Sequence, residues 1–300
     1  MIRIVTDSTA SIPRALALEN DIEVLSLFIN YNGEEYEDAT MDVDAFYQDI
    51  YHMVDSIPTS SQPSQGSVEE LFKHIAEAGD DLVGVFMSSR MSGTLNAALQ
   101  AARRIAARHE GFKFRIVDTM SNSFDEAWAV LAAAAARAKG CTLEQCGEAA
   151  AMSAASSRFL FTPESLRFLK AGGRIGNGAA LLGTLMKIRP IFTVTDGETA
   201  TFAKVRTHGK AVKAIVEKFK SDIDEFGLRN VVVHYIGSPD EALKWAREVI
   251  EPLCGKPVSV VPVSPVIGLH VGPAVGIAYE CEKPLPGRLS FDSPALVYSA

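Results

Sequence analysis

The chain has 300 residues, of which 47% are apolar and 22% are charged, and its formal net charge is −8. This composition is ordinary for a globular protein, and the length exceeds the usual size of one domain, so we expect two domains. The acidic balance argues against a nucleic-acid partner, and no apolar run approaches the roughly 20 residues that would predict an integral membrane span.

The first residues run directly into a strand pattern with no signal-peptide organisation. The chain has four cysteines, and they show neither a CxxC pair nor a spacing typical of metal ligands. We therefore expect a cytoplasmic protein with reduced cysteines, without a bound metal ion and without a cofactor.

Short apolar runs alternate with amphipathic segments over the first half of the chain. The apolar runs predict strands at residues 2–5, 22–28, 82–87 and 114–117, with a hairpin at 28–36 around an Asn-Gly pair. Helices are expected at 43–54, 97–107 and 127–139, and also after the capping boxes at 67–70 and 142–145. Residues 56–67 are rich in Ser, Pro and Gln and predict a loop. For residues 1–155 this alternation predicts a three-layer α/β/α domain with a mainly parallel sheet.

After residue 155 the pattern changes. A short helix is expected from Thr162 to the Gly172-Gly173 pair, followed by a hairpin of strands at 190–195 and 199–206. Later apolar runs predict strands at 231–236, 258–263 and 274–279, with a helix at 242–250. A hairpin beside crossover helices predicts a second α/β domain with a mixed sheet at 156–282. Residues 283–300 show no periodicity and are expected to form a C-terminal tail.

The segment LVGVFMSSRMSGTLN at residues 82–96 carries the clearest functional signal. A buried strand ends there in a hydroxyl-rich turn, and a helix begins directly after it. Ligands of open α/β sheets bind at the carboxyl ends of strands, and the start of a helix favours an anion. The segment therefore predicts an acidic ligand, although its serines could simply cap the helix. A serine nucleophile is a third interpretation, but Ser92 is not in a G-x-S-x-G elbow.

Three other segments could carry chemistry. The hydroxyls and the amide of residues 58–64 could line a site or belong to a polar surface loop. The glycine pair before Arg174 indicates a helix end, with Arg174 either solvated or facing the first domain, and the glycines that follow lack the Lys-Ser/Thr ending of a P-loop. His270 lies among apolar residues and glycines, where a histidine is either part of the core or a ligand contact.

Seven motifs occur in a recognisable order: TDST at 6–9, SSQPS at 60–64, SSRMSGTLNAA at 88–98, FLKAGGRIG at 168–176, KIRPIF at 187–192, KVRT at 204–207 and IGLHVGPAVG at 267–276. Over residues 2–280 the chain resembles the DegV family of bacterial fatty-acid-binding proteins, which includes the FakB subunit of fatty acid kinase. The resemblance implies a two-domain α/β fold that buries one long acyl chain.

The resemblance also implies roles for individual residues. Ser60 and Ser92 would bind the carboxylate of a long-chain fatty acid through their hydroxyls, with Ser61, Gly93 and Thr94 beside them. Arg174 and His270 would lie near the mouth, where the head group meets a partner ATP-dependent fatty acid kinase subunit. The chain would then be a lipid-binding carrier rather than an enzyme in isolation.

The sequence departs from the family pattern at two places. Ser60 stands where the family has Thr, which keeps the hydroxyl but removes a methyl group that restricts the rotamer. Bulky residues follow position 118, in DTMSNSFDEAWA, where small residues are usual, and they would reshape the tunnel for the acyl chain. The alternative function is a stand-alone small-molecule kinase subunit or hydrolase that uses Ser92 or His270.

Overall fold

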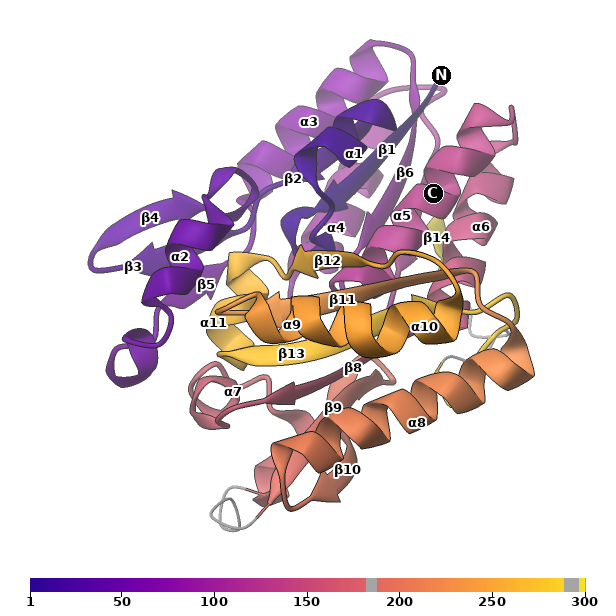
Figure 1. Cartoon of the computed structure of the whole chain (residues 1–300). Helices are drawn as coiled ribbons and strands as arrows, with labels where there is room; N and C mark the ends of the chain where they lie inside the picture. Colours follow the sequence, from indigo (N-terminus) through magenta and orange to yellow (C-terminus); the bar gives the residue numbers. More distant parts are fainter. Residues whose placement is uncertain (182–187, 289–296, 300) are drawn as a thin grey trace.

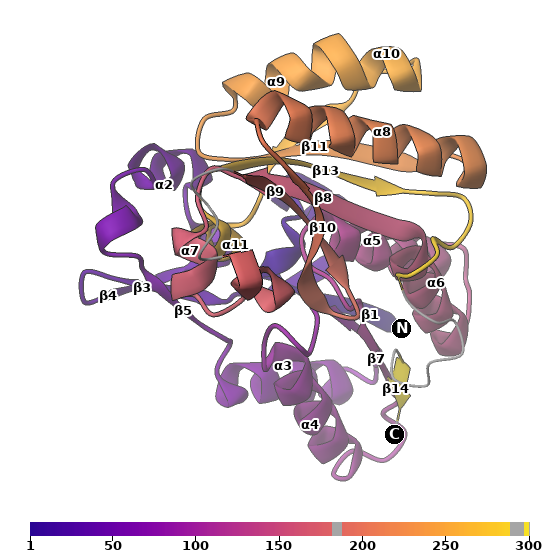
Figure 2. The same cartoon turned by 90° about the horizontal axis from the view of Figure 1, so that it is seen from below.

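The computed structural model describes residues 1–181, 188–288 and 297–299, and Figures 1 and 2 show it from two directions. A five-stranded sheet has the order β14-β7-β6-β1-β2, in which only β14 is antiparallel to its neighbour. Its strands are β1 (Ile2–Asp7), β2 (Ile22–Leu25), β6 (Asp81–Phe86), β7 (Phe114–Asp118) and β14 (Val297–Ser299). The mainly parallel sheet predicted from the sequence is confirmed.

Helices cover both faces of this first sheet. Alternate residues of β6 point to opposite faces, so Leu82 and Phe86 pack against α3 and α4, whereas Val83 and Val85 pack against α5 and α6. Both faces are therefore apolar, as a buried parallel sheet requires. The helices of this part are α1 (Arg14–Glu19), α3 (Gln65–Glu77), α4 (Thr94–Ala106), α5 (Phe124–Ala138) and α6 (Leu143–Ser156).

A six-stranded mixed sheet forms the second layer, in the order β10-β9-β8-β13-β11-β12. Only β11 and β12 are parallel within it. Its strands are β8 (Ser157–Pro163), β9 (Arg189–Thr195), β10 (Glu198–Val205), β11 (Asn230–Ile236), β12 (Ser259–Pro262) and β13 (Ala274–Glu280). Helix α5 contacts strands of both sheets and lies between them (Figure 2).

The outer face of the second sheet is covered by α8 (His208–Phe226), α9 (Asp240–Trp245) and α10 (Glu251–Cys254), as Figure 1 shows. A π-helical turn at Ala246–Ile250 joins α9 to α10. The expected mixed α/β arrangement is thus confirmed, while the division of the chain at residues 155 and 282 stays a prediction. No helix in the described part of the chain is both long and apolar enough to cross a membrane.

A small antiparallel sheet, β4-β3-β5, projects from the first sheet and carries part of the site (Figure 1). Its strands are β3 (Phe28–Tyr31), β4 (Glu34–Glu37) and β5 (Thr59–Ser61), and α2 (Val43–Asp49) follows β4. The hairpin predicted at 28–36 is present as β3 and β4. Tyr47 on α2 donates a hydrogen bond of 2.7 Å to the carbonyl of Val263, which ties this small sheet to the second layer.

Several predicted boundaries are wrong. Part of the predicted loop at 56–67 forms β5, because Thr59–Ser61 pairs with β3. Helix α3 begins at Gln65 rather than after Ser67, because the Ser64 hydroxyl accepts a hydrogen bond from the Ser67 amide and caps the helix. The expected helix at 43–54 ends at Asp49.

The helix expected to start at Thr162 is a strand at that point. Residues 157–163 pair with β13 on one side and β9 on the other, and the helix, α7, covers only Arg167–Ala171. Hydrogen bonding to a strand on each side outweighs the local preference of Thr-Pro to start a helix. Pro163 is the last residue of β8, so the N–H that it lacks removes no hydrogen bond from the middle of the strand. The capping box at Thr142 and Gln145 is confirmed at the start of α6.

Candidate functional site

A cavity of about 240 Å³ lies at the carboxyl ends of β1 and β6, between the two main sheets. Its polar wall includes Ser60, Ser92, Arg174 and His270, which the sequence places in four separate segments. The rest of the wall is mostly apolar, with Leu169, Phe159 and Phe161 among its residues. Three sheets and two short helices therefore contribute residues to one cavity, which is partly open to the surface.

Ser60 and His270 form the one direct hydrogen bond between polar side chains of the cavity wall that belong to different segments, within the described residues. Ser60 Oγ lies 2.8 Å from His270 Nε2. Ser60 is the central residue of β5, opposite Ile29 of β3. His270 lies on α11 (Pro265–Val271), a helix that Ser264 caps through the amide of Ile267. The pair joins residues that are 210 positions apart in the chain.

His270 is a neutral imidazole at neutral pH. Burial, with a smaller contribution from the charge of Arg174, lowers the pKa of His270 to about 4. The opposite ring nitrogen, Nδ1, is buried and has no hydrogen-bond partner among the described residues. A side chain at Gly172 would overlap this nitrogen, so the glycine lets α7 approach the ring closely.

The ionisation of His270 gives a first prediction. In a pH titration of the histidine ring resonances by NMR, we expect His270 to titrate near pH 4, well below the ordinary 6.5. In the unfolded chain the imidazole is protonated below about pH 6.5, whereas in the folded chain it is protonated only below about pH 4. The free energy of unfolding therefore falls as the pH is lowered from 6.5 to 4. Arg174→Ala should raise this pKa part of the way toward 6.5, and Lys170→Ala should leave it unchanged. A His270 pKa at or above 6.5 would contradict the buried neutral ring.

Two buried carboxyl groups position the hydroxyl-rich turn that contains Ser92. Asp7, at the end of β1, accepts hydrogen bonds from the Met87 amide at 3.1 Å and from the Thr9 amide at 2.9 Å. Asp118, at the end of β7, accepts from the Met120 amide at 2.8 Å and the Ser89 amide at 3.4 Å. Burial raises the pKa of both carboxyl groups above their ordinary value. Strand ends thus hold the loops that surround the cavity.

Ser92 lies where this turn meets α4. Its hydroxyl accepts a hydrogen bond of 3.3 Å from the Thr94 amide and lies 2.9 Å from the Thr94 hydroxyl. The N-cap of α4 is Gly93, so Ser92 is not the capping residue that the sequence suggested. Its hydroxyl bonds to the first residue of the helix, and the same serine also lines the cavity. Gly93 lets the loop after β5 come close, since a side chain there would overlap Gln62. The positive end of the α4 dipole adds to the preference of this end for an anion.

Arg174 is exposed, yet it reaches the first layer. Its Nε donates to the Met91 carbonyl at 3.3 Å, and its Nη1 donates to the Gly172 carbonyl at 2.7 Å. Neither partner is an acid, so within the described residues the guanidinium bridges the two layers without an ion pair. This places a cation at the rim of the cavity that the two serines line.

The structure brings most of the predicted site residues together. Six of them line the cavity: Ser60, Ser61, Ser92, Gly93, Arg174 and His270. Thr94 is fully buried behind the wall and supports Ser92 instead. Thr9 and Asn122 also line the cavity; Thr9 lies within the TDST motif, but no local pattern pointed to Asn122. Among the residues that the structure describes, no group of three or more His, Cys, Asp or Glu could hold a metal ion.

Relatives with similar sequences cover nearly the whole chain. Residues 1–282 match the DegV family, which is described as a family of uncharacterised proteins. A DegV domain-containing protein of Clostridium acetobutylicum is 38% identical over 283 residues, which are 94% of this chain and 98% of that protein. One from Clostridium perfringens is 36% identical over 283 residues, covering 94% of this chain and 99% of the other.

Solved structures show the same architecture. A DegV family protein of Thermus thermophilus, described for its fatty acid binding, matches with a TM-score of 0.80 and 28% identity over 93% of this chain and 99% of that one. A stearic-acid-binding protein of Eubacterium ventriosum matches with a TM-score of 0.84 and 26% identity, over 94% and 99%. The sequence match over residues 1–282 and these relatives lead to one conclusion: the chain belongs to the DegV family.

Proposed function

We propose that this chain binds one long-chain fatty acid, with the carboxylate at Ser60 and Ser92 and the acyl chain in the apolar part of the cavity. The observation that carries the proposal is that hydroxyls from two segments distant in the sequence, strand β5 and the turn after β6, line one otherwise mostly apolar space between the sheets. The relatives from Thermus thermophilus and Eubacterium ventriosum, described as binding fatty acid and stearic acid, support it.

The acyl chain would supply most of the affinity. Each buried methylene contributes about 0.8 kcal/mol, so about 15 of them gain roughly 12 kcal/mol before the costs of association and ordering. A cavity of 240 Å³ takes the head group and the first part of such a chain. A small neighbouring cavity shares Phe159, Phe161, Ile267 and Val271 with the first, which indicates the direction that the remaining methylenes would follow.

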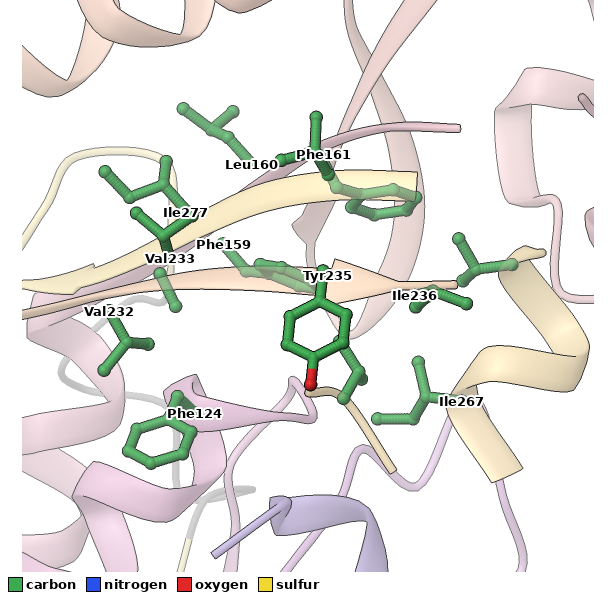
Figure 3. Close-up of a cluster of buried hydrophobic side chains, with 14 of the residues drawn as sticks. Phe124, Phe159, Leu160, Phe161, Val232, Val233, Tyr235, Ile236, Ile267 and Ile277 are labelled. Atoms are coloured by element: carbon green, nitrogen blue, oxygen red, sulfur yellow. The ribbon is translucent and has the colours of Figure 1, made fainter. Parts of the chain in front are cut away.

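Figure 3 shows Phe124, Phe159 and Phe161 within a cluster of buried apolar side chains. Phe159 packs against Phe161 with ring centroids 5.1 Å apart, and against His234 at 5.6 Å. His234 in turn contacts Phe124, whose ring centroid is 5.5 Å away. Because His234 lines the small neighbouring cavity, Phe124, a residue of the bulky segment after position 118, lies near the far end that we propose for the acyl chain.

The carboxylate needs hydrogen-bond donors, because a buried charge without them takes up a proton instead. With its proton on Nε2, His270 donates to Ser60 Oγ, and the Ser60 hydroxyl proton is then free for the carboxylate. Ser92 would donate from the other side, beside the start of α4. The donors are neutral, so they hold the carboxylate without a fixed counter-charge.

We further propose that the chain is a carrier that presents this carboxylate to a partner ATP-dependent kinase subunit, and that it acts in the cytoplasm without a cofactor of its own. A carboxylate oxygen would attack the γ-phosphorus of ATP held by the partner, the bond from that phosphorus to the β–γ bridging oxygen would break, and acyl phosphate and ADP would form. The exposed Arg174 at the rim would stabilise the charge on the transferring phosphoryl group.

The close Ser60–His270 pair also favours a second candidate, a hydrolase, since a serine beside a histidine is the arrangement of an activated nucleophile. Two observations weigh against it. His270 Nδ1 has no described partner that would orient the ring, as the third member of a triad does. A histidine with a pKa of about 4 is also a weak base at neutral pH.

Solvent extraction of the purified protein followed by mass spectrometry tests the proposed function. We expect about one fatty acid per chain, or uptake of added palmitate by delipidated protein. In the same preparation, the unchanged chain should hydrolyse a p-nitrophenyl ester no faster than the Ser60→Ala variant does. Recovery of no lipid together with no uptake of palmitate or oleate would refute the carrier, and ester hydrolysis that is lost in Ser60→Ala would establish the hydrolase instead.

A further inference from the structure

Residues 283–288, which we call the C-terminal segment, follow β13 and lie beyond the part of the chain that matches the DegV family. Two of its side chains, those of Leu285 and Arg288, are buried. The Leu285 amide also donates a hydrogen bond of 3.0 Å to the carbonyl of Ala155. The segment that the sequence predicted as part of a tail is therefore packed into the molecule.

Arg288 lies at a junction of four other segments. Its Nε donates to the Ser157 carbonyl at 2.9 Å, and its Nη1 donates to the carbonyls of Met120 and Val194, both at 3.2 Å. Its Nη2 donates to Asp125 Oδ2 at 2.9 Å. These acceptors belong to β8, the loop after β7, β9 and α5. One buried guanidinium thus fixes the relative positions of four segments.

Three of these segments also supply the wall of the cavity proposed for the fatty acid. Val194 lines the cavity itself. Asn122 and Phe159, which also line it, stand only two residues after Met120 and Ser157. The hydrogen bonds of Arg288 therefore reach the backbone that carries this wall, although Arg288 itself does not line the cavity.

The loop after β7 has a backbone conformation that needs support. Met120 and Ser123 have φ angles of 51° and 58°, in the left-handed region that residues other than glycine rarely adopt. Met120 is held on both sides, because its amide donates to Asp118 Oδ1 and its carbonyl accepts from Arg288. Phe124 begins α5 directly after Ser123, so its orientation depends on this loop.

We propose that Arg288 is a positioning residue for the acyl chain: it holds the loop after β7 so that Phe124 limits the length of the fatty acid that the site accepts. The inference rests on the proposed function, since it concerns the far end of the same ligand. Phe124 contacts His234, which lines the small neighbouring cavity. When the loop relaxes, Phe124 can move away from His234 and leave room for further methylenes.

Arg288→Lys tests this role, because the ammonium group keeps a positive charge beside Asp125 but lacks the fork of donors that reaches the three carbonyls. In isothermal titration calorimetry with delipidated protein, we expect the affinity for stearate relative to myristate to rise about fourfold for each additional methylene that becomes buried. A general loss of stability would weaken the binding of both acids alike. Lys283→Met, at an exposed position of the C-terminal segment, is the control that should leave the ratio unchanged.

Hydrogen exchange of backbone amides in the ligand-free protein tests the positioning itself. We expect the Met120 amide to exchange faster in Arg288→Lys, while the Gly255 amide at the end of α10 keeps its rate. Leu285→Ala loosens the C-terminal segment but leaves the pair of Arg288 and Asp125 in place. It should change the exchange rate and the affinity ratio in the same direction, and it decides the outcome if Arg288→Lys does not fold.

A stearate-to-myristate ratio that is the same in the unchanged chain and in the folded variants would overturn the proposal, even if the Met120 amide exchanges faster. An unchanged exchange rate of that amide would overturn it too, because the loop would then not depend on Arg288. Failure of the unchanged chain to bind either acid would refute the proposed function, and with it the selection of chain length. The exchange comparison in ligand-free protein would still show whether Arg288 holds the loop, so the two failures are distinguishable.

Discussion

Palmitate is expected to bind Ser60→Ala about 10- to 100-fold more weakly than the unchanged chain, because a hydrogen bond to a charged group contributes roughly 1.5–3 kcal/mol. Ser60 is the better choice for this test than Ser92. Removing the Ser92 hydroxyl also removes a partner of the Thr94 amide, the first of α4, so palmitate binding and the local structure of the turn would change together. Isothermal titration calorimetry with delipidated protein measures the loss.

Thr59→Ala is the matched control for this prediction. Thr59 is the neighbour of Ser60 in β5, but it is exposed and does not line the cavity, so its hydroxyl should not affect palmitate binding. The total loss of binding free energy in the double variant Ser60→Ala/Ser92→Ala should differ from the sum of the losses in the two single variants, because both hydroxyls serve one carboxylate. A Ser60→Ala protein that binds palmitate as tightly as the Thr59→Ala control would contradict the assignment of the head group.

The hydroxyl-rich turn around Ser92 could be predicted from the sequence for a local reason. An apolar run that stops at Met87, followed by small polar residues and an amphipathic segment, contains all the information needed for a strand, a turn and a helix start. In a parallel sheet this turn lies at the carboxyl ends of the strands, which is where ligands bind. No contact from elsewhere in the chain is required for that step.

Ser60 and His270 could be connected only through the family resemblance. Their hydrogen bond joins β5 to α11 across 210 positions, and neither residue has a local pattern that distinguishes it from a loop serine or a core histidine. The same limit explains the boundaries that were wrong. Strands β5 and β8 owe their conformation to pairing with β3, β9 and β13, and a single sequence does not contain that pairing information.

The polar groups that the fold buries around the cavity decide which charge its wall can accept. The wall presents neutral hydroxyl donors, with the exposed Arg174 at its rim, and this arrangement favours an anion. Helix α11 fixes part of the wall, since Asp38 accepts a hydrogen bond from the Val266 amide in its first turn and His270 lies near its end.

Arg288→Met is expected to lower the free energy of unfolding by roughly 3–5 kcal/mol, the usual cost of leaving one member of a buried ion pair without its partner. Arg288 lies in the segment interpreted from the sequence as a tail, yet it is only 2% exposed. Its Nη2 donates to Asp125 Oδ2 at 2.9 Å, and the same guanidinium donates to the carbonyls of Ser157, Met120 and Val194. It therefore joins the second sheet to α5 and to the loop after β7.

Urea titration measures this loss, with Lys283→Met, an exposed residue of the same segment, as the control that should change stability little. Burial raises the pKa of Asp125 to about 6 even beside Arg288, above the 3.8 of the unfolded chain, so its ionisation costs stability as the pH rises through 6. Without Arg288 this pKa rises further, and the cost at pH 8 grows. The difference between Arg288→Met and the unchanged chain should thus be larger at pH 8 than at pH 5, and a difference that does not vary with pH would contradict the role of the charge pair.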